Sequence, residues 1–463
     1  MKRQPITMQM PVNIGKLHFI GIGGIGMSGI AEILFNLGYE ITGSDIKESD
    51  TTKRLENMGI KIFIGQNKSN IASAEAIVIS TAIKEDNPEY ISAQKNDIPI
   101  VHRSEMLAEV MRLRLSIAIA GTHGKTTTTS LVAHALSEAG LNPTIINGGI
   151  INKFGSNAKL GEGKWLVAEA DESDGSFTRL PATIAIVSNI DAEHLDFYGD
   201  FDSVKKAFSQ FVENIPFYGA VILCTDNKEV QKLRLKIKNR RVITYGLNSK
   251  ADVRADNIRT DIKGTTFDVI MKNGNIKDLF IPINGKHNIQ NTLASIAAAM
   301  EVGIENNKIQ KLYQKFKGVK RRFTNTGTFN RAKVIDDYAH HPVEIKATLQ
   351  AGRSSTSGKI HAIMQPHRYT RLQNLFKDFS TCFGDADYVH ILPVYSANEE
   401  PIDNVNSENL TKNIITSGHK NASYQKNFQD LKTTLSKTVK SEDIVIFMGA
   451  GDITKWAYEI SDE

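Results

Sequence analysis

The stretch Ser116–Ser130, SIAIAGTHGKTTTTS, joins an apolar run to a glycine-rich turn and then to a run of helical periodicity. Ser116–Ala120 is apolar and partly β-branched, which predicts a buried strand that ends at Gly121. From Thr126 to Ala139 the apolar residues recur at helical spacing. The stretch therefore predicts a strand, a glycine loop and a helix in that order.

The glycine loop of this stretch predicts a cradle for a phosphate group. Backbone N–H groups and the helix N-terminus would face the anion, Lys125 would add a positive charge, and the Thr126 hydroxyl would bind Mg²⁺. The spelling departs from G-x-x-x-x-G-K-[ST], because only two residues separate Gly121 from Gly124. Its place between a buried strand and an amphipathic helix still favours a phosphate site over an ordinary turn. The candidate residues are Gly121, Thr122, His123, Gly124, Lys125, Thr126 and Thr127.

Length and composition indicate a globular chain of several domains. At 463 residues it is too long for one core, so we expect two to four domains. A net charge of +5 is too mild over this length to indicate nucleic-acid binding. The two cysteines form no CxxC pair, which fits a reducing cytoplasm. Because no apolar signal region or membrane-length run occurs, we expect a cytoplasmic protein without membrane insertion.

A second glycine motif follows a strand predicted at Leu17–Ile20. Gly21, Gly23 and Gly26 form G-x-G-x-x-G at the start of a predicted helix, and Asp45 ends the next predicted strand. NAD is one candidate ligand. However, the glycines require only the close approach of a pyrophosphate and the acid only a ribose-type hydroxyl, so any nucleotide diphosphate would fit. The alternating strands and helices predict a Rossmann-like first domain.

Polar residues gather where predicted strands of the middle segment end. The strand Trp165–Ala170 runs into the acidic cluster Glu169–Asp174, and the strand Thr183–Ile190 leads to His194. Open α/β sheets bind ligands at carboxyl strand ends, and hard cations prefer oxygen ligands. We therefore expect one of the acids to bind Mg²⁺ opposite Thr126. A solvated acidic loop and a structural histidine remain open from these residues alone.

The end of the middle segment predicts antiparallel strands followed by a helix. Turn signals within Ile258–Ile283 indicate hairpins. The segment Gly285–Asn291 precedes a helix predicted over Thr292–Val302. Asn288 and Asn291 could cap this helix or present their amide groups to a purine base.

The last third of the chain again places polar residues after predicted strands. Val334–Tyr338 runs into a His-His-Pro sequence at 340–342, and Ile360–Gln365 runs into His367–Arg371. Strand-then-helix order implies a parallel, doubly wound sheet. Arginine with tyrosine and histidine suits a small ligand with a carboxylate, because a guanidinium group binds a carboxylate bidentately.

Together these motifs resemble the Mur ligase family over nearly the whole chain. The resemblance depends on Gly21–Gly26, Gly121–Thr126, Glu169–Asp174, Asn189–Asp196, Gly285–Asn291, Asp336–Pro342 and Gln365–Arg371. It implies an α/β protein of three domains. The first, residues 1–109, is Rossmann-like and binds a UDP-sugar. The second, 110–320, is a central P-loop ATPase-like domain with added antiparallel strands. The third, 321–463, is a doubly wound domain that closes over both.

The resemblance also implies a reaction, ATP-dependent amide formation in peptidoglycan precursor synthesis. The motifs are most similar to those of members that join L-alanine to the lactyl carboxylate of UDP-N-acetylmuramate. ATP would phosphorylate this carboxylate, and the amine of L-alanine would attack the acyl phosphate. The implied cofactors are ATP and two Mg²⁺ ions. The implied partners are these small molecules, without nucleic acid, and the chain would be a monomer or a homodimer.

The resemblance assigns roles to individual residues. The catalytic residues would be Lys125, His194 and His340. The metal ligands would be Thr126, Glu169 and His194. The UDP-sugar would contact Gly21, Gly23, Gly24, Gly26, Asp45, Ser80 and His102. Besides the glycine loop, ATP would contact His287, Asn288, Asn291, Arg322 and Asp337. The L-alanine pocket would contain Tyr338, His367, Arg368 and Arg371.

One departure from the wider family narrows the prediction. Several sibling ligases carry a carbamylated lysine that bridges two cations, and the matching position here is Phe208, near Lys205 and Lys206. Members that add L-alanine resemble this chain in lacking that lysine. Three alternatives remain: a recycling ligase that attaches an intact tripeptide to the same UDP-sugar, an NAD-dependent oxidoreductase, and a non-catalytic nucleotide switch.

Overall fold

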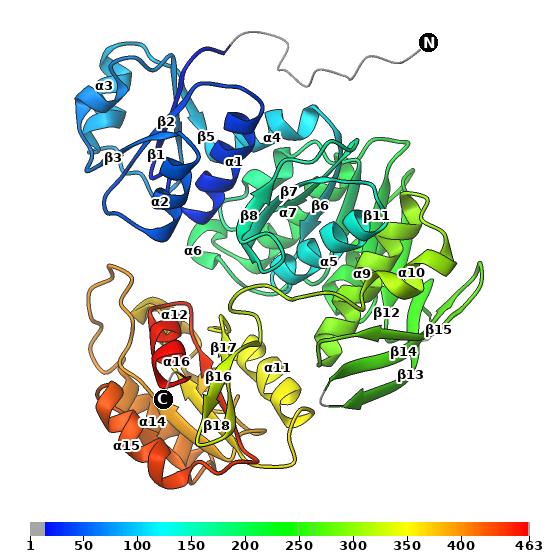
Figure 1. Ribbon diagram of the computed structural model, residues 1–463, viewed down its shortest axis with the longest axis vertical. Helices are drawn as coiled ribbons and strands as arrows, with labels where there is room; N and C mark the ends of the chain where they lie inside the picture. Colours follow the sequence, from blue (N-terminus) through cyan, green and yellow to red (C-terminus); the bar gives the residue numbers. More distant parts are fainter. Residues whose placement is uncertain (1–13, 249, 262, 462–463) are drawn as a thin grey trace. The chain divides into compact units, whose positions relative to one another are not determined.

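The computed structural model describes residues 14–461 except 249 and 262 (Figure 1). It divides into two compact units. The first runs to Asp256 and adds Phe267–Leu279 and Gln290–Lys317. The second contains Asn257–Thr266, Phe280–Ile289 and the chain from Gly318 onward. Three sheets of five, ten and six strands form the framework.

The N-terminal sheet is parallel and has the strand order β3-β2-β1-β4-β5. Its strands are β1 (Leu17–Ile20), β2 (Ile41–Asp45), β3 (Lys61–Ile64), β4 (Ala76–Ile79) and β5 (Ile100–His102). Its helices are α1 (Ile25–Asn36), α2 (Asp50–Asn57), α3 (Pro88–Lys95) and α4 (Arg103–Arg112), with a 3₁₀ turn at Lys68–Ile71. This is the Rossmann order, in which chain direction switches beside β1, so a ligand site is expected at the end of β1.

Residues that alternate along β1 explain why helices cover both faces of this sheet. Leu17 and Phe19 pack in the core that contains α1 and α4. Ile20 packs in a separate cluster with Ala93 of α3. Because successive side chains of a strand point to opposite faces, a strand buried on both faces is mostly apolar, as in the sequence LHFI. Its one polar residue, His18, is buried, and its Nδ1 lies 2.9 Å from Thr42 Oγ1.

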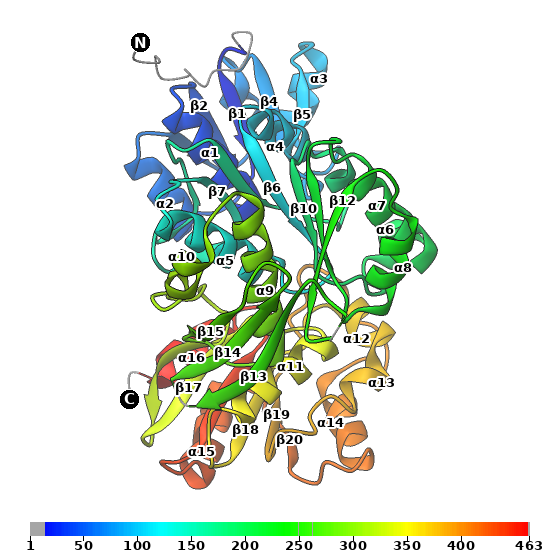
Figure 2. The same ribbon diagram turned by 90° about the vertical axis from the view of Figure 1, so that its right-hand side faces the viewer.

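The central sheet has the order β15-β14-β13-β12-β11-β10-β6-β9-β7-β8. Its strands are β6 (Leu115–Ala120), β7 (Thr144–Ile151), β8 (Ser156–Lys159), β9 (Trp165–Glu169), β10 (Ile184–Val187), β11 (Ala220–Cys224), β12 (Arg241–Gly246), β13 (Val253–Asp261), β14 (Gly264–Met271) and β15 (Ile276–Ile281). Figure 2 shows β13, β14 and β15 as long green strands. The strand β6 lies between β10 and β9, parallel to both, so the loops that follow these three strands meet at one edge.

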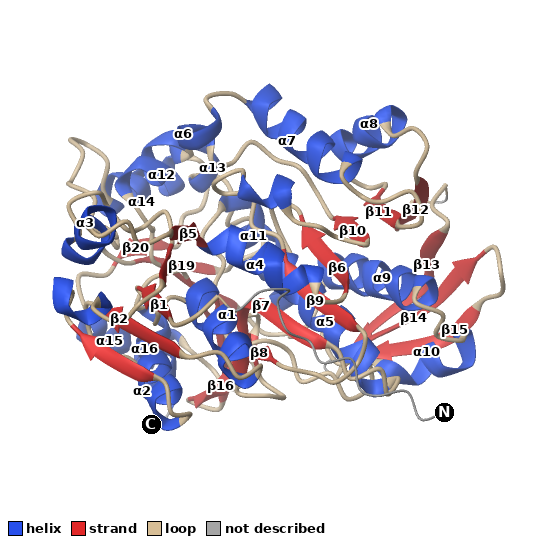
Figure 3. Ribbon diagram, turned by 90° about the horizontal axis from the view of Figure 1, so that it is seen from above, coloured by secondary structure: helices blue, strands red, loops and turns tan. Residues whose placement is uncertain are grey.

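Helices surround this sheet, and one of them supports the phosphate loop. They are α5 (Lys125–Glu138), α6 (Leu195–Tyr198), α7 (Phe201–Glu213), α8 (Lys228–Lys236), α9 (Lys286–Glu301) and α10 (Asn306–Leu312), with a 3₁₀ turn at Ser176–Arg179. The helix α5 packs on β6, β7 and β9 (Figure 3). Its residues Leu131, Val132, Ala135 and Leu136 are fully buried, as the helical spacing predicts.

The N-terminal and central domains contact each other within the first unit. The helix α1 packs on β7 and β8 (Figure 1). Glu32 of α1 is 8% exposed, forms an ion pair with Arg54, and accepts a hydrogen bond from Ser156 Oγ at 2.9 Å. Asn157 donates to the carbonyl of Ile25 at 2.5 Å. A buried carboxylate at this interface is therefore both paired and hydrogen-bonded.

The third sheet has the order β16-β17-β21-β18-β19-β20. Its strands are β16 (Thr324–Phe329), β17 (Ala332–Asp337), β18 (Ile360–Met364), β19 (Tyr388–Ile391), β20 (Ala422–Tyr424) and β21 (Ile444–Met448). Its helices are α11 (Pro342–Arg353), α12 (Tyr369–Asn374), α13 (Phe376–Phe379), α14 (Ser407–Thr416), α15 (Phe428–Thr438) and α16 (Ile453–Ser461). Two apolar clusters, one with α11 and α14 and the other with α15 and α16, cover its two faces.

The predicted fold class is confirmed, and the differences are local. The helix α9 begins at Lys286 rather than Thr292, so Asn288 and Asn291 lie inside its first turns and do not cap it. The strand β10 ends at Val187 because Ser188 and Asn189 turn to bond the phosphate loop.

Four further elements, α4, β7, β8 and β16, were not predicted from the sequence pattern. The helix α4 follows β5 directly, and Met111 in its last turn is fully buried. The pair β7 and β8 is antiparallel. The strand β16 runs antiparallel to β17, so the third sheet, which was expected to be parallel throughout, has one antiparallel edge strand. Of the helices that the structure describes, none is long and apolar enough to cross a membrane.

Candidate active site

The phosphate loop connects β6 to α5 and contains two glycines that the geometry requires. Gly121 has φ of +137°, and a Cβ there would lie 2.1 Å from Ser188 Oγ. Gly124 has φ of +80° at the residue before α5, where a Cβ would lie 3.0 Å from Asn291 Oδ1. Both values lie in the left-handed region that favours glycine. The chain can therefore turn tightly from strand to helix and leave the first N–H groups of α5 directed at the loop.

The residues after β10 hold this loop in place. The backbone N–H of His123 donates to Asn189 Oδ1 at 2.7 Å, and that of Asp191 donates to Thr122 Oγ1 at 2.9 Å. His123 Nε2 lies 3.4 Å from Asp191 Oδ2. The hydroxyl of Ser188 donates to the His123 carbonyl at 2.9 Å. Loop shape is thus set by β10 as well as by the glycines.

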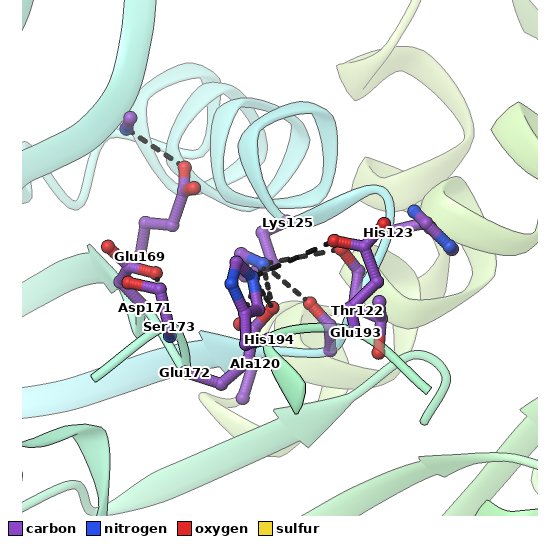
Figure 4. Close-up of polar contacts among 12 residues, drawn as sticks. Ala120, Thr122, His123, Lys125, Glu169, Asp171, Glu172, Ser173, Glu193 and His194 are labelled. Atoms are coloured by element: carbon purple, nitrogen blue, oxygen red, sulfur yellow. Dashed lines mark hydrogen bonds and ion pairs between the residues drawn. The ribbon is translucent and has the colours of Figure 1, made fainter. Parts of the chain in front are cut away.

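Lys125, the first residue of α5, is bound on several sides (Figure 4). Its Nζ donates to the Gly121 carbonyl at 2.8 Å, and it lies 2.7 Å from Oε1 and 2.6 Å from Oε2 of Glu172. Burial alone would lower the pKa of Lys125, but the carboxylates of Glu172, Asp171 and Glu169 raise it above its usual value. The lysine is therefore held as a cation at the loop.

The three predicted metal ligands lie at or just after the ends of three neighbouring strands, β6, β9 and β10. Thr126 is buried in the first turn of α5. Glu169 ends β9, and its carboxylate accepts a hydrogen bond from the backbone of Gly148 at 2.9 Å (Figure 4). His194 has φ of +56°, and its Nε2 lies 3.7 Å from Glu172 Oε1. No group of three or more His, Cys, Asp or Glu is arranged to hold a metal among the residues described here.

These donors fit a cation that is shared with phosphate oxygens. Mg²⁺ usually takes one or two carboxylates and completes its shell with substrate phosphates and water. The Thr126 hydroxyl and the Glu169 carboxylate are hard oxygen donors at the phosphate loop, which is the set that such a site needs.

The N-terminal glycine motif forms a second cradle at the end of β1. Gly21 has φ of +74°, and its N–H donates to the Ser44 carbonyl at 2.8 Å. The N–H of Gly23 donates to Asp45 Oδ2 at 2.9 Å, so the acid at the end of β2 lies against the loop. Gly24 is the residue before α1. The predicted glycines and Asp45 therefore come together, as a Rossmann motif requires.

Two residues at the start of α4 connect this cradle to the acidic cluster of the central domain. A Cβ at Gly26 would lie 2.6 Å from the guanidinium of Arg103, and Arg103 forms an ion pair with Asp171 at 3.2 Å. His102 caps α4 and lies 3.8 Å from Asp174 Oδ2. Burial lowers the pKa of His102 below its usual value. Ser80 follows β4 on the same parallel sheet.

In the second unit, two of the predicted ATP contacts, Asp337 and His287, lie close enough to Arg322 for its charge to act on them. Asp337 accepts hydrogen bonds from Phe323 at 2.7 Å and Ala339 at 2.8 Å, and burial raises its pKa to about 6. Burial, reinforced by the positive charge of Arg322, lowers the pKa of His287 to about 4. The Asn288 amide donates to the Asn284 carbonyl at 2.7 Å. Asn291 belongs to the first unit, where its side chain contacts Gly124 of the phosphate loop.

The predicted amino-acid pocket is assembled from the ends of β17 and β18. The rings of Tyr338 and His340 lie 5.2 Å apart, and those of His340 and His367 lie 6.0 Å apart. The guanidinium of Arg371 lies 3.3 Å from His367 Nδ1. Burial and the positive charges of His340, Arg371 and Arg368 lower the pKa of His367 to about 4. Arg368, with φ of +71°, is the residue immediately before α12.

Three residues at these sites were not singled out from the sequence. Glu172 binds Lys125, Arg103 lies over Gly26, and the Tyr395 ring stacks on His367 with centroids 5.4 Å apart. Glu172 was one of several acids in a cluster, and Arg103 followed a histidine that drew the prediction. The three-dimensional structure was needed to show that Glu172 is the acid of this cluster that contacts Lys125.

Models of one family match most of the chain. They are the Mur ligase family catalytic domain over residues 16–114, the Mur ligase middle domain over 119–299, and the Mur ligase glutamate ligase domain over 321–451. The chain belongs to the Mur ligase family.

Within this family, the chain is similar to ligases that act on UDP-N-acetylmuramate and L-alanine. The chain is 53% identical to a UDP-N-acetylmuramate–L-alanine ligase from Brucella anthropi, over 98% of each chain, and shares the same identity and coverage with that of Brucella suis biovar 1. Among solved structures it resembles UDP-N-acetylmuramate-alanine ligase MurC from Thermotoga maritima, at 28% identity and a TM-score of 0.82, over 96% and 98% of the chains. A murein peptide ligase from Psychrobacter arcticus shares the fold, with a TM-score of 0.70 at 23% identity over 96% and 98% of the chains.

Proposed function

We propose that this chain is an ATP-dependent ligase that joins L-alanine to the lactyl carboxylate of UDP-N-acetylmuramate, a step of peptidoglycan precursor synthesis. The observation that carries the proposal is the occurrence of two separate anion cradles, one after β1 and one after β6, in a chain 53% identical to such ligases. An oxidoreductase that uses the first cradle for NAD would leave the second cradle without a role.

The cradle after β6 would bind the triphosphate of ATP. The N–H groups at the start of α5 offer hydrogen bonds to phosphate oxygens, and Lys125 offers a cation where charge grows during phosphoryl transfer. Gly121, Thr122, His123 and Gly124 form the loop, and Thr127 lies in the first turn of α5 behind it. We further propose that His287, Asn288, Asn291, Arg322 and Asp337 contact ATP, which is supported by the cation of Arg322 beside His287.

Thr126 and Glu169 would hold one Mg²⁺ and His194 a second. Divalent cations at these positions would offset the repulsion between the lactyl carboxylate and the γ-phosphate. This chain's own residues would then orient the reactants. The oxygen of the carboxylate attacks the γ-phosphorus, the bond to ADP breaks, and an acyl phosphate forms.

The cradle after β1 would bind UDP. The glycines at 21, 23, 24 and 26 let the backbone approach a diphosphate, and Asp45 would accept a hydrogen bond from a ribose hydroxyl. We propose that Ser80 and His102 face the same ligand, because each lies at the carboxyl end of its strand.

The second unit would bind L-alanine and complete the reaction. Arg368 and Arg371 would hold its carboxylate, beside Tyr338 and His367. His367 would be neutral at pH 7, since its pKa is lowered to about 4. His340 would take a proton from the ammonium group, whose nitrogen then attacks the acyl carbon as phosphate leaves. We propose that this reaction takes place in the cytoplasm, which both free buried cysteines fit.

A phosphate-release assay with Mg²⁺, ATP and UDP-N-acetylmuramate tests the proposal, scanned over single amino acids and over a peptidoglycan tripeptide. We expect phosphate release that depends on both the sugar nucleotide and L-alanine, with product confirmed by mass spectrometry. Turnover with the tripeptide and none with L-alanine would assign the recycling activity instead. Binding of ATP without any amide product would assign a nucleotide switch.

A further inference from the structure

Glu172 is the side chain that reaches the phosphate-loop lysine most closely. Both of its carboxylate oxygens lie within 2.7 Å of Lys125 Nζ, and its side chain is 2% exposed. Figure 4 shows the lysine, Glu172 and His194 converging, while Glu169 turns toward a backbone amide. Burial raises the pKa of Glu172 to about 7, while the Lys125 cation opposes this shift.

The segment that carries Glu172 is anchored from two domains. The hydroxyl of Tyr198 donates to the Glu172 carbonyl at 2.6 Å, and the N–H of Gly175 donates to it at 3.1 Å. The neighbouring Asp171 forms an ion pair with Arg103 of α4 at 3.2 Å. Glu172 is therefore held at a fixed place, and one of its anchors comes from the wall of the sugar-nucleotide cradle.

A buried carboxylate and a phosphate group must compete for one ammonium group. Removing its counter-ion from water-excluded surroundings is costly for a carboxylate, so Glu172 opposes any movement of Lys125 away from it. A phosphate that recruits Lys125 must either displace this contact or share the cation. The same contact limits the positions that the lysine side chain can adopt, which favours a single orientation.

We propose that Glu172 is a positioning residue for Lys125 that lowers the affinity for ATP and fixes the lysine in its productive orientation. The proposal depends on the proposed function only in taking Lys125 as a phosphate-binding residue. Arg103 contributes indirectly, because it anchors Asp171 beside Glu172. Glu172 touches no reacting atom in this account and acts through Lys125, which it contacts more closely than it does His194.

The test compares Glu172→Gln with the unaltered chain in two measurements. Calorimetry gives the Kd of ADP, once with Mg²⁺ and once with the metal chelated, and steady-state kinetics gives kcat. We expect Glu172→Gln to bind ADP about tenfold more tightly in both conditions, because the loss of one charge-assisted contact frees the cation. We expect kcat to fall by about tenfold to a hundredfold, because the lysine loses its orientation.

Matched variants separate this role from a structural one. Glu162→Gln removes an exposed carboxylate of the same domain and should change neither quantity. Glu172→Asp keeps the charge on a shorter side chain and should restore part of kcat. In a Lys125→Gln background, Glu172→Gln should no longer change the Kd of ADP.

Several results would overturn the proposal. Unchanged or weaker binding of ADP in Glu172→Gln would show that Glu172 does not compete with phosphate. A change confined to the samples with Mg²⁺ would assign Glu172 as a metal ligand instead. If Glu172→Gln does not fold, a Glu172→Asp variant that binds ADP as the unaltered chain does and keeps full kcat would also contradict it. Failure of the proposed function is a different outcome, in which the unaltered chain binds no ADP at all.

Discussion

At the scale of single residues, the chemistry depends on side chains that follow the ends of parallel strands. Lys125 follows β6, Glu172 follows β9, and His194 follows β10. The motif spacing was sufficient to predict the glycine loop and its lysine, because both are local features. The partner of the lysine was not predictable in this way. The sequence shows a cluster of four carboxylates, but which of them lies nearest Lys125 depends on how the strands pair.

Lys125→Ala should abolish turnover and leave binding of the sugar nucleotide intact. We expect kcat to fall by about a thousandfold, because a cation that stabilises the transferred phosphoryl group is lost. The Kd of UDP-N-acetylmuramate should stay unchanged, because that ligand would lie against Gly21–Gly26 on another domain. Phosphate release and calorimetry check the two quantities. Loss of both together would contradict the separation of the cradles.

Gly121→Ala should weaken ATP binding far more than a comparable change elsewhere. A methyl group there would lie 2.1 Å from Ser188 Oγ, in a backbone conformation with φ of +137°. The strain is on the order of 1–3 kcal/mol and acts on the phosphate loop itself. Gly140→Ala is the matched control, because φ is +82° there but nothing lies within 4 Å. Equal ADP affinity in the two variants would show that loop shape does not decide binding.

At the scale of elements, the sequence predicted most strands and helices but not every boundary. Periodicity identified β6, α5 and α7, and the apolar residues that it placed in the core are buried, although Leu115 at the start of β6 is 37% exposed. Periodicity predicted that the helix begins at Thr292, whereas α9 begins at Lys286. The earlier start is possible because Asn288 and Ile289 donate their N–H groups to the Gly285 carbonyl. Periodicity also missed β16, whose sequence TNTGTF lacks an apolar pattern and is a strand only because it pairs with β17.

Neighbouring strands of the third sheet bury histidines, which makes its stability depend on pH. His390 of β19 lies stacked beside His361 of β18 at 6.0 Å, and Ser423 lies 3.1 Å from its Nδ1. Burial and the His361 charge lower the pKa of His390 to about 3. Below pH 6.5 His390 becomes protonated in the unfolded chain, while in the folded chain it stays neutral until the pH approaches 3. This contribution to stability is therefore complete above pH 6.5 and is lost as the pH falls toward 3.

A His390→Phe variant measures that contribution. Between pH 7 and pH 5 the free energy of unfolding should fall by about 2 kcal/mol more in the unaltered chain than in the variant. Urea denaturation at several pH values gives both slopes. Parallel slopes would mean that His390 takes up its proton as readily in the folded as in the unfolded chain.

At the scale of the whole molecule, two domains of the first unit are joined through buried polar groups. Glu32 of α1 is paired with Arg54 and hydrogen-bonded to Ser156 of the central domain. No sequence pattern predicted this contact, because the partners lie more than a hundred residues apart and each is an ordinary polar residue. The division into 1–109, 110–320 and 321–463 remains a prediction.

Glu32→Ala should destabilise the first unit by about 2 kcal/mol, because the half-buried Arg54 loses its counter-ion and the Ser156 hydroxyl loses its acceptor. Thermal and urea unfolding measure the change. Glu40→Ala is the control: its side chain is 75% exposed and pairs with Lys16 at 3.3 Å on the surface, so we expect about 0.5 kcal/mol or less. A loss in Glu32→Ala no larger than that in the control would show that the contacts of Glu32 with Arg54 and Ser156 do not stabilise the first unit.

The claim on which the whole account depends is that a carboxyl group of the sugar nucleotide is activated as an acyl phosphate. Isotope transfer tests it directly: UDP-N-acetylmuramate is labelled with ¹⁸O in both oxygens of its lactyl carboxylate and is turned over with ATP and L-alanine. We predict that the released inorganic phosphate carries one ¹⁸O atom per amide bond formed, since the attacking carboxylate oxygen departs with the phosphate. Phosphate without label, or label recovered in AMP, would contradict the account.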